Sequence, residues 1–316
     1  MTSKCPEKDC WAPEMACNLG WDLADCPHYK DVVKGDKDSK NAPSEFLLPW
    51  SGNSLGMVDL QFVAGRSRPI LIGVIGAHNA GKTTLLTALY LLLGQGRQVE
   101  NRRFAGSYTL GGWENLAHSL RWTSNQGPHF PPHTPNDAGR LPGLLHLAFR
   151  RDDSILEDVL LTDAPGEWFE RWAIDKDASD LEGARWISRN TDSFIFLVDS
   201  DALAGSDRGE ARTNINILAQ RVGNELQNRP IAVVWSKSDI TVNKPIREGL
   251  TSNFNKLFEY QEFAVSVETK ENGTKVTAEA FMKLLSWLLE SHRRIDSEDL
   301  LLAVMQAQDP MLSFRG

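Results

Sequence analysis

The sequence has no hydrophobic run long enough to cross a membrane. Its longest apolar stretches, such as Ile70–Ile75 and Leu85–Leu93, are short or broken, whereas a transmembrane helix needs about 20 mainly apolar residues. The chain starts with MTSKCPEKDC, which lacks the apolar segment of a secretory signal. We therefore expect no membrane span and a cytoplasmic location.

The sequence also lacks an excess of positive charge. Its 34 Lys and Arg residues are outnumbered by 42 Asp and Glu residues, which gives a formal net charge of −8. Proteins that bind nucleic acid without sequence specificity depend on net positive charge facing the phosphates. The charge balance therefore argues against nucleic acid as a partner. With 41% hydrophobic residues over 316 positions, the chain can still form a packed core.

Cysteine is absent from the chain after residue 26. The four cysteines, at Cys5, Cys10, Cys17 and Cys26, all lie in the N-terminal segment. In a reducing cytosol a disulfide framework is not expected, whereas four thiolates suffice for a closed tetrahedral zinc site. Their spacing lacks the C-x2-C pairs of a zinc ribbon, so free buried thiols are the alternative. We predict a small Cys-rich module with structural Zn²⁺, together with a linker, over residues 1–40.

From about Phe46 the sequence alternates between short apolar runs and longer amphipathic stretches. The runs are rich in β-branched residues and mostly continuous, which is typical of strands covered on both faces. They are Ile70–Ile75, Leu144–Phe149, Val159–Leu161, Phe194–Val198, Ile231–Trp235 and Phe263–Val267. The helix candidates between them are Lys82–Leu93, Ala178–Arg189, Arg208–Gln227, Arg247–Tyr260 and Ala278–Ser291.

This alternation predicts an α/β fold with a mainly parallel six-stranded sheet and helices on both faces. The runs at 144–149 and 156–162 are separated by a polar turn that is too short for a helix, so we expect one antiparallel hairpin strand. The stretch 94–142 does not fit the alternation. It holds one short helix candidate, Trp113–Trp122, and is otherwise rich in Gly and Pro. Loops of that length inside a compact domain are usually functional or partly disordered.

A phosphate-binding loop follows the first strand candidate. Residues 76–83 read GAHNAGKT, a match to G-x-x-x-x-G-K-[ST], between a strand and a helix as that motif requires. The glycines let the backbone curl so that successive N–H groups point at phosphate oxygens. Lys82 would bridge the β- and γ-phosphates during catalysis, and Thr83 would ligate Mg²⁺. The expected nucleotide contacts here are Gly76, His78, Asn79, Ala80, Gly81, Lys82, Thr83 and Thr84.

A second phosphate-side motif ends the strand candidate at Val159–Leu161. It reads Asp163-Ala164-Pro165-Gly166, a D-x-x-G. The Asp163 carboxylate could hold Mg²⁺ through water, and the Gly166 N–H could sense the γ-phosphate. Placed at a strand end after a phosphate loop, the pattern predicts a P-loop NTPase.

Base choice needs separate evidence, because phosphate loops occur in both ATP- and GTP-binding proteins. Ser236, Lys237 and Asp239 form an S-K-S-D that is similar to the guanine-reading [NT]-K-x-D, with Ser in place of Asn or Thr. Asp239 could accept from the ring N–H and the exocyclic amine of guanine, a donor pair that adenine lacks. The Lys237 stem would lie along the base, and Ser266 would present a backbone N–H to the guanine carbonyl.

The order GAHNAGKT, DAPG, SKSD and AVS resembles the translation-factor-related (TRAFAC) class of P-loop GTPases over roughly residues 68–292. The long loop, the DAPGEWF segment and the Cys cluster look like the bacterial double-GTPase type of predicted multi-gene conflict systems. The resemblance implies a GTPase domain at 46–292 and a tail at 293–316. It also implies GTP or GDP with Mg²⁺, slow hydrolysis stimulated by a partner or cation, and protein effectors.

The resemblance also suggests switch and catalytic residues. A Thr before the hairpin strand would close over Mg²⁺ and the γ-phosphate, and its position favours Thr134 over Thr109. Glu167 stands where many relatives place a water-orienting Gln; a carboxylate could orient water but would repel the γ-phosphate, so it is either catalytic or a switch-loop charge. Asn79 is similar to the Asn that seats K⁺ in potassium-dependent GTPases. The alternatives are a GTP-dependent scaffold with negligible hydrolysis, and an ATP-using kinase or ATPase.

Overall fold

The computed structural model describes residue 26 and residues 54–65, 67–120, 142–178, 180–267 and 278–291. The chain divides into two units, Met1–Trp50 and Ser51–Gly316. Apart from Cys26, everything below concerns the second unit. Within the described residues, no helix combines the length and the hydrophobicity that a membrane crossing requires.

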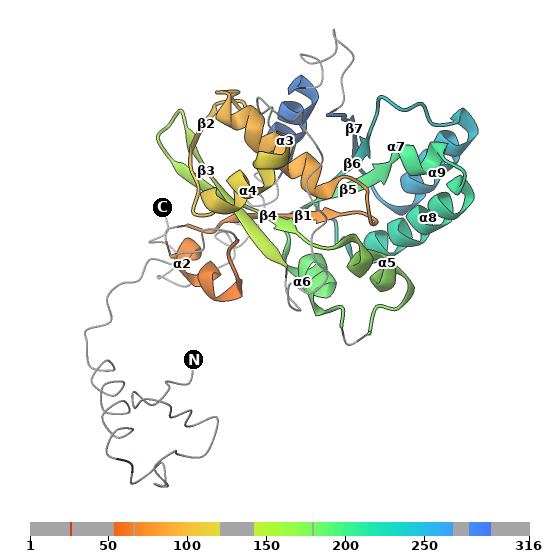
Figure 1. Cartoon of the computed structure of the whole chain (residues 1–316), viewed down its shortest axis with the longest axis horizontal. Helices are drawn as coiled ribbons and strands as arrows, with labels where there is room; N and C mark the ends of the chain where they lie inside the picture. Colours follow the sequence, from red (N-terminus) through yellow and green to blue (C-terminus); the bar gives the residue numbers. More distant parts are fainter. Residues whose placement is uncertain are drawn as a thin grey trace, which may run out of the picture. The chain divides into compact units, whose positions relative to one another are not determined.

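A seven-stranded sheet forms the centre of the second unit, in the order β2-β3-β4-β1-β5-β6-β7 (Figure 1). The strands are β1 (Ile70–Ile75), β2 (Arg102–Gly106), β3 (Gly143–Arg151), β4 (Leu156–Asp163), β5 (Ser193–Asp199), β6 (Ile231–Ser236) and β7 (Gln261–Ala264). Only β3 among them is antiparallel to its neighbours, β2 and β4, and the other pairs are parallel. The mainly parallel α/β sheet with one antiparallel strand is therefore confirmed.

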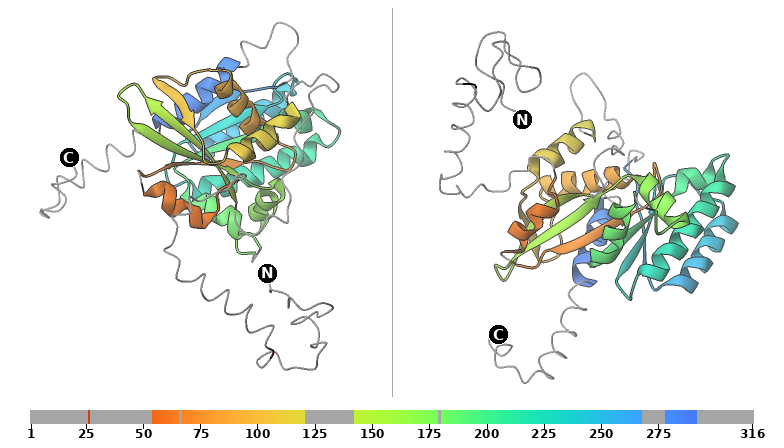
Figure 2. Two further views of the ribbon diagram at one scale, coloured as in Figure 1. Left: turned by 60° about the vertical axis from the view of Figure 1, so that its left-hand side comes forward. Right: turned by 90° about the horizontal axis from the view of Figure 1, so that it is seen from below.

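Helices cover both faces of the sheet. They are η2 (Met57–Asp59), α2 (Leu60–Ala64), α3 (Lys82–Gly94), α4 (Leu110–Leu120), α5 (Gly166–Ile174), α6 (Glu182–Asn190), α7 (Ser200–Ala204), α8 (Arg208–Glu225), α9 (Lys244–Leu257) and a helix over 278–291. One hydrophobic core joins the sheet to α3, α4 and the 278–291 helix, and a second joins it to α5, α6, α8 and α9. Figure 2 shows helices on both sides of the sheet. Because both faces are covered, every residue of β1, β5 and β6 is buried.

The prediction of six strands was wrong, because it missed β2. This strand reads RRFAG and pairs with β3 at one edge of the sheet. Its two arginines and its glycine give no apolar run. It is a strand because Phe104 lies opposite Phe149 of β3, and that pairing cannot be read from local sequence.

The last strand was placed too far along the chain, at Phe263–Val267 rather than Gln261–Ala264. Beyond Ala264 the chain leaves the ladder. The Val265 N–H still bonds to the Trp235 carbonyl, but the Val265 carbonyl accepts from the Ser238 N–H at 3.1 Å. The backbone after β7 therefore joins the loop after β6 instead of continuing the strand. Residues 121–141 of the long loop lie outside the described residues.

Candidate functional site

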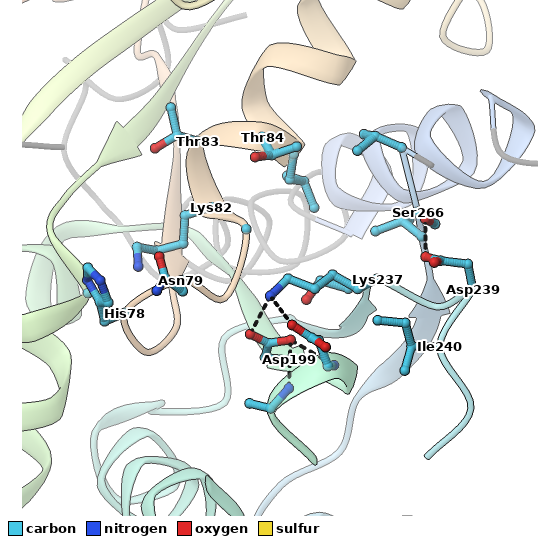
Figure 3. Close-up of a pocket in the computed structure, with 18 of the residues that line it drawn as sticks. His78, Asn79, Lys82, Thr83, Thr84, Asp199, Lys237, Asp239, Ile240 and Ser266 are labelled. Atoms are coloured by element: carbon cyan, nitrogen blue, oxygen red, sulfur yellow. Dashed lines mark hydrogen bonds and ion pairs between the residues drawn. The ribbon is translucent and has the colours of Figure 1, made fainter. Parts of the chain in front are cut away.

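A cavity of about 860 Å³ lies where β1, β4, β5, β6 and β7 end, and its wall is built from six separate parts of the chain. The predicted residues in that wall are His78, Asn79, Gly81, Lys82, Thr83, Thr84, Gly166, Glu167, Ser236, Lys237, Asp239 and Ser266. Figure 3 shows the phosphate-loop side and the Lys237–Asp239 side of the same cavity. Gly76 and Ala80 are buried behind this wall. The fold therefore brings most of the predicted binding residues to one place.

The phosphate loop owes its shape to two left-handed residues. β1 ends at Ile75 and α3 begins at Lys82, and between them Asn79 has φ 59° and Gly81 has φ 88°. Gly adopts such angles without strain, and Asn tolerates them better than most residues. The resulting curl leads directly into the N-terminus of α3, where helical N–H groups and the helix dipole favour an anion.

Lys82 is the buried cation of the site. Only 7% of its surface is exposed, and its Nζ donates to the Gly76 carbonyl at 3.1 Å and to the Ala77 carbonyl at 2.8 Å. Burial lowers the pKa of the Lys82 ammonium from 10.5 to about 8, although the charges of Asp163, Glu167 and Glu170 oppose this shift. An anionic ligand would restore the favourable environment that the charged form lacks.

Thr83 and Asp163 form an oxygen-rich pair beside Lys82. The Thr83 hydroxyl donates to Asp163 Oδ1 at 3.3 Å, which joins the first turn of α3 to the end of β4. A hydroxyl and a carboxylate are hard oxygen donors of the kind that Mg²⁺ uses when it bridges nucleotide phosphates. The donor set therefore fits Mg²⁺.

Gly166, the first residue of α5, is pressed against the phosphate loop. A Cβ atom built at this position would lie 2.4 Å from the His78 nitrogen and 2.6 Å from the Ala77 carbonyl carbon. No side chain fits at that distance. The glycine of the D-x-x-G segment is therefore required by this close backbone approach.

Two glutamates of α5 also contact the phosphate loop. Glu167 Oε1 lies 2.8 Å from Nδ1 of the His78 imidazole, and Glu170 Oε1 accepts the His78 backbone N–H at 2.7 Å. Glu167 was a predicted site residue, whereas Glu170 was missed. Its spacing of three from Glu167 would have placed both on one helix face, had a helix been expected after the DAPG turn.

The other end of the cavity holds the guanine-reading candidates. Asp239 accepts a short hydrogen bond from the Ser266 hydroxyl, which joins the loops that follow β6 and β7. The Ser236 hydroxyl donates to the Val198 carbonyl at 3.3 Å, and its Cβ lies 3.8 Å from the place of a Cβ on Gly81. Ser236 therefore lies between the base side and the phosphate side of the cavity.

Lys237 is held by two carboxylates that sequence reasoning missed. Its Nζ lies 2.8 Å from Asp199 Oδ2 and 3.5 Å from Asp201 Oδ2, as Figure 3 shows for Asp199. The other Asp199 oxygen accepts the N–H groups of Asp201 and Ala202 and so caps α7. The sequence feature that could have identified them is the run Asp199-Ser200-Asp201. It directly follows the predicted strand Phe194–Val198, at the edge of the sheet where the nucleotide-binding motifs lie.

The remaining predicted residues lie apart from this cavity or outside the described part of the chain. Thr109 is buried, and its hydroxyl accepts the His146 backbone N–H at 2.9 Å, away from the cavity wall. Thr134, Cys5, Cys10 and Cys17 lie outside the described residues, whereas Cys26 is buried with a free thiol. Among the residues that the structure describes, no three His, Cys, Asp or Glu residues gather as metal ligands.

Comparison with known families identifies the domain. The profile of the Double-GTPase 2 family matches residues 70–288. The chain belongs to this family. The match runs from β1 into the helix over 278–291 and so covers every part of the cavity wall. The double-GTPase resemblance noted from the sequence is thus confirmed, and GTP is the nucleotide that family membership implies. No curated protein matches the chain.

Proposed function

We propose that this double-GTPase domain binds GTP with Mg²⁺, hydrolyses it slowly and acts as a nucleotide-controlled switch. One observation carries the proposal: Asp239 and Lys237 lie in the same cavity wall as Lys82 and Thr83. A single ligand could therefore reach both ends, with a purine at Asp239 and phosphates at the loop.

Different residues would bind the phosphates and the base. Lys82 and the N–H groups at the start of α3 would hold the β- and γ-phosphates, and Mg²⁺ would bind between Thr83 and Asp163. When bound, the metal neutralises charge that develops on the phosphates during hydrolysis. Asp239 would select guanine through two N–H donors that adenine does not present together.

Hydrolysis itself would depend on further residues. Glu167 is our candidate for orienting the attacking water, and Thr134 our candidate for closing over Mg²⁺ and the γ-phosphate. Asn79 would help to seat K⁺, and that ion would supply positive charge at the transition state. The pairing of Glu167 with His78 also supports the second candidate, a GTP-dependent scaffold with negligible turnover. Single-turnover hydrolysis in K⁺ and in Na⁺ separates the two.

Two further proposals concern the rest of the chain. Cys5, Cys10, Cys17 and Cys26 would hold one structural Zn²⁺ in a module over residues 1–40. The GTPase domain would span 46–292, with the tail at 293–316 after it. A nucleotide-controlled switch acts through proteins that distinguish its nucleotide states. We therefore expect protein effectors, such as other members of a multi-gene system, to bind according to the nucleotide.

The proposal is tested by changing Asp239 to Asn and titrating GDP, ATP and xanthosine diphosphate. The substitution removes the acceptor for both guanine donors, and a lost charge-assisted pair of hydrogen bonds weakens binding by roughly 100-fold. Xanthine carries a carbonyl where guanine carries the amine, so the Asn amide can donate to it and affinity for xanthosine diphosphate should rise. Asp177→Asn, at an exposed carboxylate outside the cavity wall, is the matched control. Equal losses for GDP and ATP would refute guanine selection by Asp239.

A further inference from the structure

The two glutamates at the start of α5 bring negative charge to the side of the cavity where phosphate would bind. Glu167 and Glu170 stand on one face of the helix, and both contact His78, one through its imidazole and one through its backbone N–H. Backbone N–H groups of a phosphate loop are the donors that normally face phosphate oxygens. In this structure one of them donates to a carboxylate of the chain itself.

The pKa of Lys82 also reflects the negative charge that α5 brings to the phosphate side of the cavity. The carboxylates of Asp163, Glu167 and Glu170 each raise the pKa of its ammonium, against the larger effect of burial. The α5 carboxylates are therefore close enough to stabilise the cation that would hold the β- and γ-phosphates. Without a nucleotide, α5 supplies part of the negative charge that the loop would otherwise receive from phosphate.

A terminal phosphate would compete with this arrangement. Lys82, Thr83, Asp163 and Gly166 mark where the γ-phosphate would lie, and the Gly166 backbone already touches His78. A γ-phosphate carries roughly two negative charges and repels nearby carboxylates. A nucleoside diphosphate lacks this group and would leave the Glu170–His78 bond intact.

We propose that Glu170 is a specificity-determining residue that disfavours the triphosphate, because its bond to the His78 N–H must break when a γ-phosphate binds. This inference rests on the proposed function and assigns the preference between GDP and GTP to one side chain. Breaking the bond releases the N-terminal half of α5, which is the part of the helix that touches the phosphate loop. The nucleotide state is thereby converted into a movement of α5.

The proposed movement is confined to this N-terminal half, because the other end of α5 is fixed. The Arg221 guanidinium of α8 donates to the carbonyls of Trp172 and Ala173 at 3.2 and 3.3 Å, and the Trp172 side chain is only 2% exposed. Trp168 lies in the first turn and is also buried. Its surroundings should therefore change with the nucleotide, while those of Trp172 stay the same.

The test measures dissociation constants of the full chain for fluorescent GDP and for a fluorescent non-hydrolysable GTP analogue, both with Mg²⁺. Glu170→Gln keeps the shape and an acceptor oxygen but removes the charge, and Glu170→Ala removes the bond as well. Glu182→Gln, the same change at an exposed position of α6, is the control. Thermal melting of each variant shows whether it is folded. If Glu170→Ala does not fold, the isosteric Glu170→Gln still tests the proposal.

Glu170→Gln should tighten binding of the GTP analogue about tenfold, the ratio between a charged and a neutral hydrogen bond. It should change GDP binding less than twofold, and the control should change neither. If Glu170→Gln leaves the ratio of the two affinities unchanged, whether or not both nucleotides bind more tightly, the role of Glu170 is overturned while GTP binding stays in place. If the wild-type chain binds neither guanine nucleotide, the proposed function itself fails.

Discussion

Replacing Lys82 with Met should remove a cost of burying charge that lowers the stability of the nucleotide-free protein at neutral pH. Lys82 is nearly fully buried, and burial lowers the pKa of its ammonium from 10.5 in the unfolded chain to about 8 in the folded one. Below pH 8 both states are protonated, so the folded state bears the whole cost of burying the charge. Above pH 10.5 both states are neutral and that cost is gone.

The sign and size of the effect follow from proton linkage. Between pH 8 and 10.5 the unfolded chain binds more protons at this lysine than the folded chain, so the stability contributed at this position rises with pH. Each pH unit in that window is worth about 1.36 kcal/mol. From pH 7 to pH 10, wild type should therefore gain roughly 3 kcal/mol relative to Lys82→Met.

The assay is urea unfolding of both proteins at pH 7, 8, 9 and 10, without nucleotide and with a chelator. Taking the difference between the two proteins at each pH removes every titration that they share. Lys283→Met, at an exposed lysine of the 278–291 helix, is the matched control and should show no such trend. If the difference between wild type and Lys82→Met is the same at pH 7 and pH 10, Lys82 does not bear a burial cost and the reasoning is refuted.

Two further substitutions test contacts of the fold, one at the phosphate loop and one in the core away from the cavity wall. Gly166→Ala places a Cβ 2.4 Å from the His78 nitrogen, so it should destabilise the protein by about 1–3 kcal/mol in thermal melting. Gly94→Ala, with nothing near its Cβ, should be neutral or stabilising, and equal melting of the two variants would contradict the packing argument. His146→Leu removes the imidazole that lies 2.9 Å from the buried Asp158 carboxylate, and should cost about 3 kcal/mol in urea unfolding. A loss below about 1 kcal/mol would show that Asp158 does not depend on that imidazole.

The parts of the fold that could be predicted from sequence are those that local pattern determines. β1, the phosphate loop and α3 follow one another without a break, and each has its own signal: a continuous apolar run, two glycines with Lys82, and a helical stretch. Pro165 and Gly166, the N-cap and the first residue of α5, read as a turn, so this helix was missed. Pro is in fact well suited to a helix start, because it has no N–H to leave without a partner.

The residues that escaped prediction are positioned by long-range contacts. Asp199 matters because β5 lies beside β6, which brings its carboxylate to Lys237, 38 positions away in sequence. Glu170 matters because α5 folds back on the phosphate loop, 92 positions away. Neither stands in a motif, since a motif records spacing along the chain and not the neighbours that the sheet order creates.

Several groups that the proposed nucleotide would contact already have a partner within the chain. The pairs are Lys82 with two loop carbonyls, Thr83 with Asp163, the His78 N–H with Glu170, Lys237 with Asp199 and Asp239 with the Ser266 hydroxyl. Buried polar groups without partners would be costly, so these pairs keep the fold stable without a ligand. Binding must therefore exchange partners, and affinity depends on the difference between old and new contacts. A γ-phosphate adds one exchange that GDP does not require, the loss of the Glu170 bond, and for that reason a switch can be built at this position.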